Sequence, residues 1–206
     1  MKNIAVLVSG GGTNLQALMD ADLGGGRIVL VISSKSGVYA LTRAEENNIG
    51  TKVVEWKDYK PDRAAFSGEI LRLLKENDIE LTVYAGFTVI LDECVCEAFP
   101  NAMLNVHPSL IPAFCGEGFY GLKVHEKALE KGVKLSGATV HFVTGDCDGG
   151  PIVLQKSVPV LDGDTPESLR KRVMEKAERV ILPQAVKLFC EGRIGVSGGK
   201  TVIKRP

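Results

Sequence analysis

The sequence predicts an α/β protein with a Rossmann-like, doubly wound, mainly parallel sheet that has antiparallel strands toward its C-terminal side. Over the first two thirds of the chain, short apolar runs alternate with segments of helical periodicity. Continuous apolar runs are typical of strands buried on both faces of a parallel sheet. Residues 139–143 and 152–158 are separated by a short glycine-rich segment, which favours an antiparallel pair. We expect residues 1–206 to form one domain, with a short tail from about residue 194.

Each expected element has a local signal in the sequence. The expected strands comprise residues 4–8, 28–33, 51–54, 82–85, 102–106, 139–143 and 152–158. The expected helices comprise the segment after Asn14, residues 39–48, the segment after Asp62, residues 92–98, and a long helix that ends near Cys190. Thr165 before Pro166 marks the start of the long helix, because threonine caps helices and proline fits their first position. Two glycines between Ile194 and Val202 favour a small hairpin in the tail.

The overall charge argues against a nucleic-acid or membrane partner. Lys plus Arg equals Asp plus Glu at 25 each, so the chain has no global basic field to attract a polyanion. No apolar run approaches the roughly 18 residues of a membrane span, and the first run is too short for a signal peptide. The five cysteines form no Cys-x-x-Cys pair, which is typical of reduced thiols rather than of a metal site. We therefore expect a cytoplasmic protein without a metal.

A glycine-rich loop, residues 9–14, lies between the first expected strand and the first expected helix. Glycine lets the backbone approach an anion, and a helix start offers free N–H groups. Leu15 stands where a dinucleotide-binding Gly-x-Gly-x-x-Gly pattern needs its third glycine, and the Lys of a phosphate-binding P-loop is absent. The loop predicts a site for a phosphate monoester, with a plain strand-to-helix turn as the alternative.

Asn105 and His107 end the fifth expected strand. The two-residue period of a strand puts both side chains on the same side, and Pro108 keeps His107 extended. An amide and an imidazole at this edge of a sheet are suited to bind an oxyanion and to move a proton. Asp148, in a later glycine-rich turn, is suited to orient the imidazole. The alternatives are a core histidine and an ordinary turn; His141 is interpreted as structural, and the role of His125 stays open.

These residues belong to a longer pattern that resembles the glycinamide ribonucleotide formyltransferases, a folate-dependent family of purine biosynthesis. The matching segments comprise residues 8–16, 85–87, 104–112, 137–143, 148–152 and 154–155. They follow the family order and extend over nearly the whole chain. The resemblance implies small-molecule substrates: the amine of 5-phosphoribosylglycinamide attacks the formyl carbon of the co-substrate 10-formyltetrahydrofolate, without a metal.

The resemblance also implies residue roles. Asn105 and His107 donate to the tetrahedral oxyanion, and Asp148 supports a charged His107 and relays protons. The residues implied for the phosphoribosylglycinamide are Gly11, Gly12, Thr13, Asn14, Arg63 and Glu178, with Glu175 as the alternative to Glu178 because the spacing is one residue longer than in some members. The residues implied for the folate are Phe87, Thr88, Val89, Ile90, Leu91, Val140, His141, Val143, Thr144 and Gly145. Thr88 and Val89 stand where many members have a Met-Arg pair.

Residues 114–121 form a loop that is longer than the shortest version in the family, and we expect it to act as a flap over the pocket. The resemblance further implies a cis bond before Pro112 and a monomer or weak homodimer. Three alternatives remain. A formyltetrahydrofolate deformylase would carry an N-terminal regulatory domain, and a methionyl-tRNA formyltransferase a C-terminal basic domain; we expect neither here. A nucleotide-binding module without catalytic activity is disfavoured by the three candidate catalytic residues.

Overall fold

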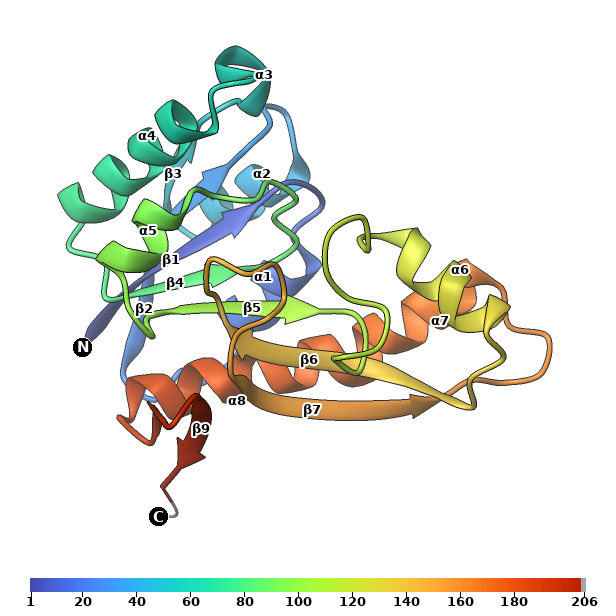
Figure 1. Cartoon of the computed structure of the whole chain (residues 1–206). Coiled ribbons are helices and arrows are strands. Elements are labelled where there is room, and N and C mark those ends of the chain that lie inside the picture. The colour runs from blue at the N-terminus through green and yellow to red at the C-terminus, as the bar shows by residue number, and fades with distance from the viewer. Residues whose placement is uncertain (205–206) are drawn as a thin grey trace.

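The computed structural model describes residues 1–204 and contains a seven-stranded sheet with helices on both faces (Figure 1). The strands of this sheet comprise β1 (Lys2–Val8), β2 (Gly26–Ser33), β3 (Gly50–Val53), β4 (Leu81–Tyr84), β5 (Met103–His107), β6 (Leu135–Phe142) and β7 (Ile152–Pro159). The helices comprise α1 (Thr13–Met19), α2 (Tyr39–Glu46), α3 (Trp56–Tyr59), α4 (Arg63–Glu76), α5 (Glu93–Ala98), α6 (Leu122–Glu130), α7 (Pro166–Val173) and α8 (Arg179–Cys190). A π-helical turn, η1 (Met174–Glu178), joins α7 to α8, and β8 (Ile194–Ser197) pairs with β9 (Lys200–Ile203).

The strand order is β3-β2-β1-β4-β5-β6-β7. The five strands from β3 to β5 pair in parallel, whereas β6 is antiparallel to both β5 and β7. The predicted fold class is therefore confirmed. Because the chain moves outward from β1 to β2 on one side and returns to β4 on the other, the strand order reverses between β1 and β4. In open α/β sheets, ligands bind beyond the carboxyl ends of the strands at such a reversal.

The continuous apolar run of β1 is explained by two cores on opposite faces of the sheet. Ile4, Val6 and Val8 belong to the core under α1, α2, α7 and α8, while Ala5 and Leu7 belong to the core under α4 and α5. All five side chains are fully buried. A strand that is covered on both faces has no solvent side, which is why its sequence does not alternate between apolar and polar residues.

The predicted elements occur in the predicted order, with a few differences. Two helices are additional to the expected ones. Helix α3 has four residues, too few to show a helical period, and α6 begins after Gly121 without a side-chain cap. The long helix is not uniformly α-helical, because η1 interrupts it. The tail hairpin and the cis bond between Ile111 and Pro112 are confirmed, and a second cis bond precedes Pro61. The single domain remains a prediction.

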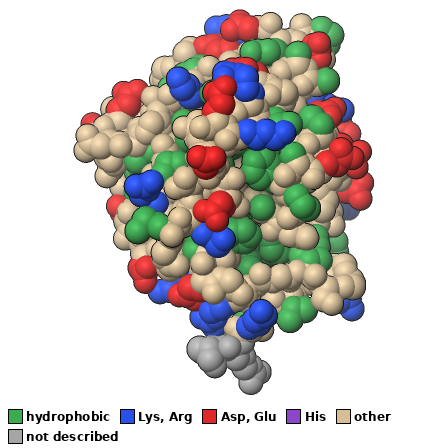
Figure 2. All heavy atoms as spheres, turned by 90° about the vertical axis from the view of Figure 1, so that its left-hand side faces the viewer, with side chains coloured by type: hydrophobic (Ala, Val, Ile, Leu, Met, Phe, Trp, Pro, Cys, Tyr) green, Lys and Arg blue, Asp and Glu red, His purple; other side chains and the backbone are tan. Residues whose placement is uncertain are grey.

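Charged side chains of both signs are interspersed over the face shown in Figure 2, and neither sign forms a broad patch there. This matches the equal numbers of acidic and basic residues in the sequence. Among residues 1–204, no helix has the length and apolar character needed to cross a bilayer.

Candidate active site

The three candidate catalytic residues meet at the carboxyl end of β5. His107 Nδ1 lies 3.3 Å from Asp148 Oδ2, and Asn105 Nδ2 donates to Asp148 Oδ1 at 3.4 Å. Asn105 and His107 thus present their side chains to the same carboxylate, as the two-residue period of the strand predicts. Asp148 comes from the loop between β6 and β7, more than 40 positions later in the chain.

His141, which was interpreted as structural and was also implied for the folate, is a fourth member of this group. It lies opposite Asn105 in the antiparallel pairing of β5 with β6. Its Nδ1 faces the Phe142 carbonyl at 2.9 Å, and its Nε2 lies 3.1 Å from Asn105 Nδ2 and 3.5 Å from Asp148 Oδ1. The His141 ring therefore lies against both the Asn105 amide and the Asp148 carboxylate, and it helps to orient the Asn105 amide.

A tight turn places Asp148. Its φ of 55° is left-handed, a conformation that aspartate tolerates better than most residues. Two residues later, a Cβ at Gly150 would lie only 1.8 Å from the Phe142 carbonyl oxygen, so this position requires glycine. The glycine-rich segment is thus a tight turn that places the Asp148 carboxylate beside Asn105 and His107. The functional role of this carboxylate remains a prediction.

The backbone beyond His107 is braced by the buried side chain of Thr139, which lies opposite His107 on β6. Thr139 Oγ1 donates to the Ser109 carbonyl at 2.7 Å and accepts from the Ile111 N–H at 3.0 Å. Gln155 on β7 donates to Thr139 Oγ1 and to the Ile111 carbonyl. These bonds fix the segment that leaves the active site, and with it the end of β5.

The flap predicted over residues 114–121 contacts two of the candidate catalytic residues directly. The Phe114 carbonyl lies 2.9 Å from His107 Nε2, and the Gly116 N–H donates to Asp148 Oδ2 at 2.9 Å. His107 therefore has a carbonyl oxygen beside one ring nitrogen and a carboxylate beside the other. Only the imidazolium can donate to both.

Two opposing effects set the proton affinities of this pair. Burial lowers the pKa of His107, whereas the Asp148 charge and the Phe114 carbonyl raise it, and burial has the larger effect. For Asp148, burial raises the pKa, but the neighbouring His141, His107 and Gly116 N–H together hold the pKa below its usual value. Asp148 is therefore ionised at neutral pH, beside an imidazole that can accept a proton and share it with the carboxylate.

The glycine loop lies between the ends of three strands. Ser9 Oγ and Ser34 Oγ are 2.7 Å apart, and the Thr88 N–H donates to Ser9 Oγ at 3.1 Å. These bonds join the ends of β1, β2 and β4. Gly12 needs its glycine for two reasons: its φ is +72°, and a Cβ there would lie 2.8 Å from Ala40 Cβ. A Cβ atom added at Gly10 or Gly11 would lie more than 4 Å from every other heavy atom of the described residues, apart from those of the glycine itself and its two chain neighbours. This side of the loop is therefore open to a ligand.

Glu178, rather than Glu175, faces the glycine loop. The Glu178 carboxylate is buried and accepts from Asn14 Nδ2 at 2.7 Å, whereas Glu175 is exposed. Thr13 Oγ1 also donates to Met174 Sδ at 3.4 Å, so both ends of η1 contact the start of α1. A π-helical turn holds one residue more than an α-helical turn. It accommodates the extra residue noted in the sequence and still aims Glu178 at Asn14.

One polar atom of the Asn14–Glu178 pair has no hydrogen-bond partner among the described residues. Asn14 Oδ1 is buried and has no hydrogen-bond partner within residues 1–204. Burial raises the pKa of Glu178, although the hydrogen bond from Asn14 and the charges of Arg170 and Arg179 oppose this. An unpaired buried amide oxygen is costly unless a donor satisfies it. The pair is suited to bind a ligand that carries N–H or O–H groups.

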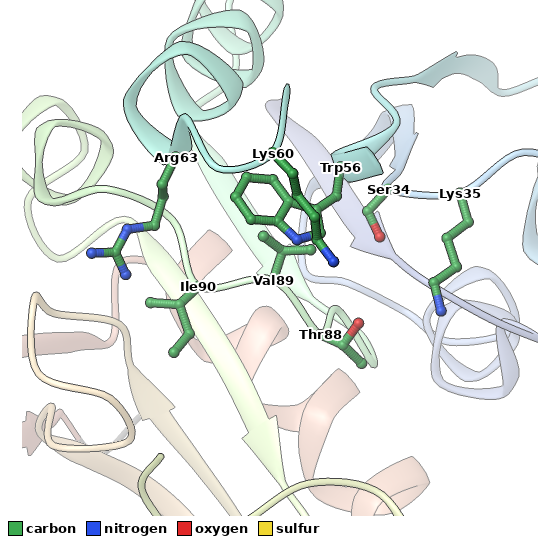
Figure 3. Close-up of a pocket in the computed structure, with 8 residues that line it drawn as sticks. All are labelled: Ser34, Lys35, Trp56, Lys60, Arg63, Thr88, Val89 and Ile90. Carbon is green, nitrogen blue, oxygen red and sulfur yellow. The ribbon is translucent and has the colours of Figure 1, made fainter. Parts of the chain in front are cut away.

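Arg63 was predicted for the phosphoribosylglycinamide, but it lines a pocket with Thr88, Val89 and Ile90, which were predicted for the folate. A pocket of about 400 Å³ opens beside the ends of β2 and β4 (Figure 3). Its lining comprises Ser34, Lys35, Trp56, Lys60, Arg63, Thr88, Val89 and Ile90. None of Lys35, Trp56 and Lys60 was predicted, because an isolated lysine or tryptophan carries no motif. The lining contains three cationic side chains and no acidic one.

The remaining residues predicted for the folate differ in what they offer. Phe87 is half-buried and packs against Tyr84 and Phe66, with ring centroids 5.6 and 6.4 Å away. The side chains of Leu91 and Val140 are buried in the cores on opposite faces of the sheet. Because its side chain is buried, Val140 offers only its backbone to a ligand. Val143, Thr144 and Gly145 follow β6 at the edge of the site. In the part of the chain that the structure describes, no group of three His, Cys, Asp or Glu side chains is arranged to hold a metal.

His125, whose role the sequence left open, is buried on α6. Neither of its ring nitrogens has a hydrogen-bond partner within residues 1–204. Burial, together with the charges of Arg170 and His107, lowers the pKa of His125 to about 4. The neutral imidazole is therefore strongly preferred in the folded protein.

We expect His125 to destabilise the protein as the pH falls from 7 to 4.5. The folded pKa lies below the unfolded value of about 6.5, so in this range the unfolded chain binds a proton that the folded chain does not. Linkage gives a loss of about 2 kcal/mol by pH 4.5. Urea unfolding of wild type and His125→Leu at both pH values measures this, and the variant should lose about 2 kcal/mol less than wild type. Equal losses would contradict the prediction.

Comparison with known proteins adds to this geometry. The formyl transferase family model matches residues 2–186. The chain is 39% identical to phosphoribosylglycinamide formyltransferase of Haemophilus influenzae, with 94% of this chain and 90% of the relative covered. It is 44% identical to the trifunctional purine biosynthetic protein adenosine-3 of Bos taurus, covering 95% of this chain but only 19% of the relative's length. The crystal structure of glycinamide ribonucleotide transformylase 1 from Symbiobacterium toebii superposes with a TM-score of 0.92 at 42% identity, covering 100% of this chain and 95% of the other.

Proposed function

Because this chain belongs to the formyl transferase family, we propose that it transfers the formyl group of 10-formyltetrahydrofolate to the amine of 5-phosphoribosylglycinamide. The observation that carries the proposal is the group formed by Asn105, His107 and Asp148, which combines two hydrogen-bond donors with a carboxylate whose side chain is only 9% exposed. The three relatives named above support a formyltransferase of purine biosynthesis, and none of them is named as a deformylase.

The reaction is an acyl transfer from N10 of the folate to an amine. A bond forms between the amine nitrogen and the formyl carbon, the bond from that carbon to N10 breaks, and one proton passes from the amine to N10. Negative charge develops on the formyl oxygen in the tetrahedral intermediate. Donors aimed at this oxygen are worth about 3–4 kcal/mol each. We assign this role to Asn105 Nδ2 and His107 Nε2.

In the free protein, internal acceptors occupy both donors. His107 Nε2 faces the Phe114 carbonyl, and Asn105 Nδ2 donates to His141 and Asp148. The formyl oxygen therefore has to replace the Phe114 carbonyl, which requires the flap to move when the folate binds. At His107, this exchange replaces one oxygen acceptor by another.

Asp148 supplies the negative charge that makes His107 a better proton acceptor. When the oxyanion forms, an imidazolium at His107 is held between the oxyanion at Nε2 and the carboxylate at Nδ1. Before the flap moves, the carboxylate also accepts the Gly116 N–H. A water molecule bound to Asp148 can carry the proton from the amine to N10.

The two substrates would bind on opposite sides of this group. Gly11, Gly12, Thr13 and Asn14 are proposed to bind the phosphate, and Glu178 the glycinamide part, since its carboxylate accepts N–H and O–H groups. The folate is proposed to lie against residues 87–91 and the backbone of residues 140–145. In this arrangement the anionic tail of the folate enters the pocket lined by Lys35, Lys60 and Arg63. These residues supply the positive charge that many family members have as an arginine at the position of Val89.

The first test is an absorbance assay of folate product, with and without 5-phosphoribosylglycinamide. We expect turnover only when both substrates are present, with one formylated amine per folate product. Formate release in the absence of the amine would instead indicate the deformylase alternative. A protein that forms neither product would refute the proposed function and leave the fold unaffected.

A further inference from the structure

Arg43, on α2, is bonded to the glycine loop that follows β1. Its Nε donates to the Gly11 carbonyl at 3.0 Å, and its Nη1 donates to Gln16 Oε1 at 2.7 Å. We infer that Arg43 is a positioning residue for the phosphate of the amine substrate, acting through the loop. This inference rests on the proposed function, and it adds a residue that the proposed binding set does not contain.

The guanidinium is held rather than free. It stacks on the Tyr39 ring, with 4.6 Å between the guanidinium carbon and the ring centroid, and it is half-buried. The first turn of α2 also contacts the loop through its backbone, because the Ala40 N–H donates to the Gly10 carbonyl at 3.3 Å. Ala40 packs against Gly12 so closely that a Cβ on Gly12 would overlap it. Three consecutive glycines are therefore attached to α2 at three points.

These attachments matter because the loop has little to restrain it on its other side. A Cβ on Gly10 or Gly11 would meet no atom within 4 Å, and glycine has more backbone freedom than any other residue. A phosphate bound by backbone N–H groups needs those groups in one fixed orientation. Arg43 supplies that constraint at Gly11, and its positive charge lies beside the place where the anion would bind.

The bonds of Arg43 account for two of its five N–H donors. The Arg43 guanidinium connects Gly11 in the loop to Gln16 in α1, about one helical turn further along the chain. A lysine has a single ammonium on a flexible stem and cannot hold both acceptors in the same plane. The shape of the Arg43 side chain should therefore matter for phosphate binding, in addition to its charge.

The test compares Arg43→Met and Arg43→Lys with wild type, using 5-phosphoribosylglycinamide and its dephosphorylated riboside as amine substrates. We expect Arg43→Met to raise KM for the phosphorylated substrate about 10- to 100-fold, with kcat and the KM for the folate within about threefold of wild type. Arg43→Lys should show most of the same increase. With the dephosphorylated substrate, all three proteins should react alike.

Arg72→Met is the matched control, because Arg72 also makes a fork of hydrogen bonds, to Glu69 and Glu76 on α4, away from the loop. An Arg43→Met enzyme that matches this control would overturn the inference. So would an equal loss with the dephosphorylated substrate, or full activity of Arg43→Lys. If wild type shows no turnover, the proposed function fails, and calorimetry with ribose 5-phosphate decides the inference. Weaker binding by Arg43→Met than by wild type would support it, and equal or absent binding would overturn it.

Discussion

The Asp148→Asn variant is expected to lose about 10²- to 10⁴-fold in kcat, the range associated with the loss of a positioned acid–base group. The substitution preserves the shape of the side chain, and the amide oxygen can still accept the Gly116 N–H. It removes the negative charge that lies 3.3 Å from His107 Nδ1. Burial then acts on the imidazole without opposition from the carboxylate, and the imidazolium becomes harder to form.

Asp146→Asn is the matched control, since Asp146 is an exposed residue in the same loop. Both variants should unfold at nearly the same temperature as wild type. NMR titration of His107 provides a separate readout, because the Asp148 charge raises its pKa. In Asp148→Asn the pKa of His107 should fall further below its ordinary value. A rise in that pKa, or a kcat within threefold of Asp146→Asn, would contradict the proposed role of Asp148.

Much of the fold could be predicted because the burial of each strand determines which of its residues are apolar. The unbroken apolar run from Ile4 to Val8 requires cover on both faces, and two separate cores provide it. The alternation of Asn105 and His107 likewise indicates one shared side of β5. These are local properties of the chain, and the sequence records them directly.

Other features depend on pairing register, which no local pattern records. His141 faces Asn105 only because β6 pairs with β5 in one particular register. A shift of one residue would move His141 to the other face of the sheet. The choice between Glu175 and Glu178 was similarly undecided, since it depends on whether the helix is α-helical or π-helical between Met174 and Glu178.

The pocket near Arg63 shows a third limit. Lys35 follows β2, Lys60 precedes α4, and Val89 follows β4, so three separate segments contribute to it. None of the cationic residues belongs to a motif by itself. Their proximity is a consequence of the strand order, because the carboxyl ends of parallel strands lie at one edge of the sheet.

The second large effect is expected for Asn105→Ala, which should lower kcat by about 100- to 1,000-fold. The oxyanion exists only after the amine has attacked, so an interaction with it lowers the barrier without strengthening substrate binding. KM for both substrates should therefore stay within a few-fold of wild type. Asn77→Ala is a suitable control, because its amide donates to the Leu73 carbonyl in the last turn of α4.

The double variant Asn105→Ala/Asp148→Asn distinguishes a cooperating unit from two independent residues. Asn105 donates to the carboxylate that Asp148 provides, so each single variant already disturbs the partner of the other. Residues that act as a unit have non-additive effects on kcat. We expect the double variant to be little slower than Asp148→Asn alone, as measured by single-turnover formyl transfer. Losses that multiply would show that Asn105 stabilises the oxyanion independently of the carboxylate, and the geometry that places its amide between His141 and Asp148 would then have no catalytic consequence.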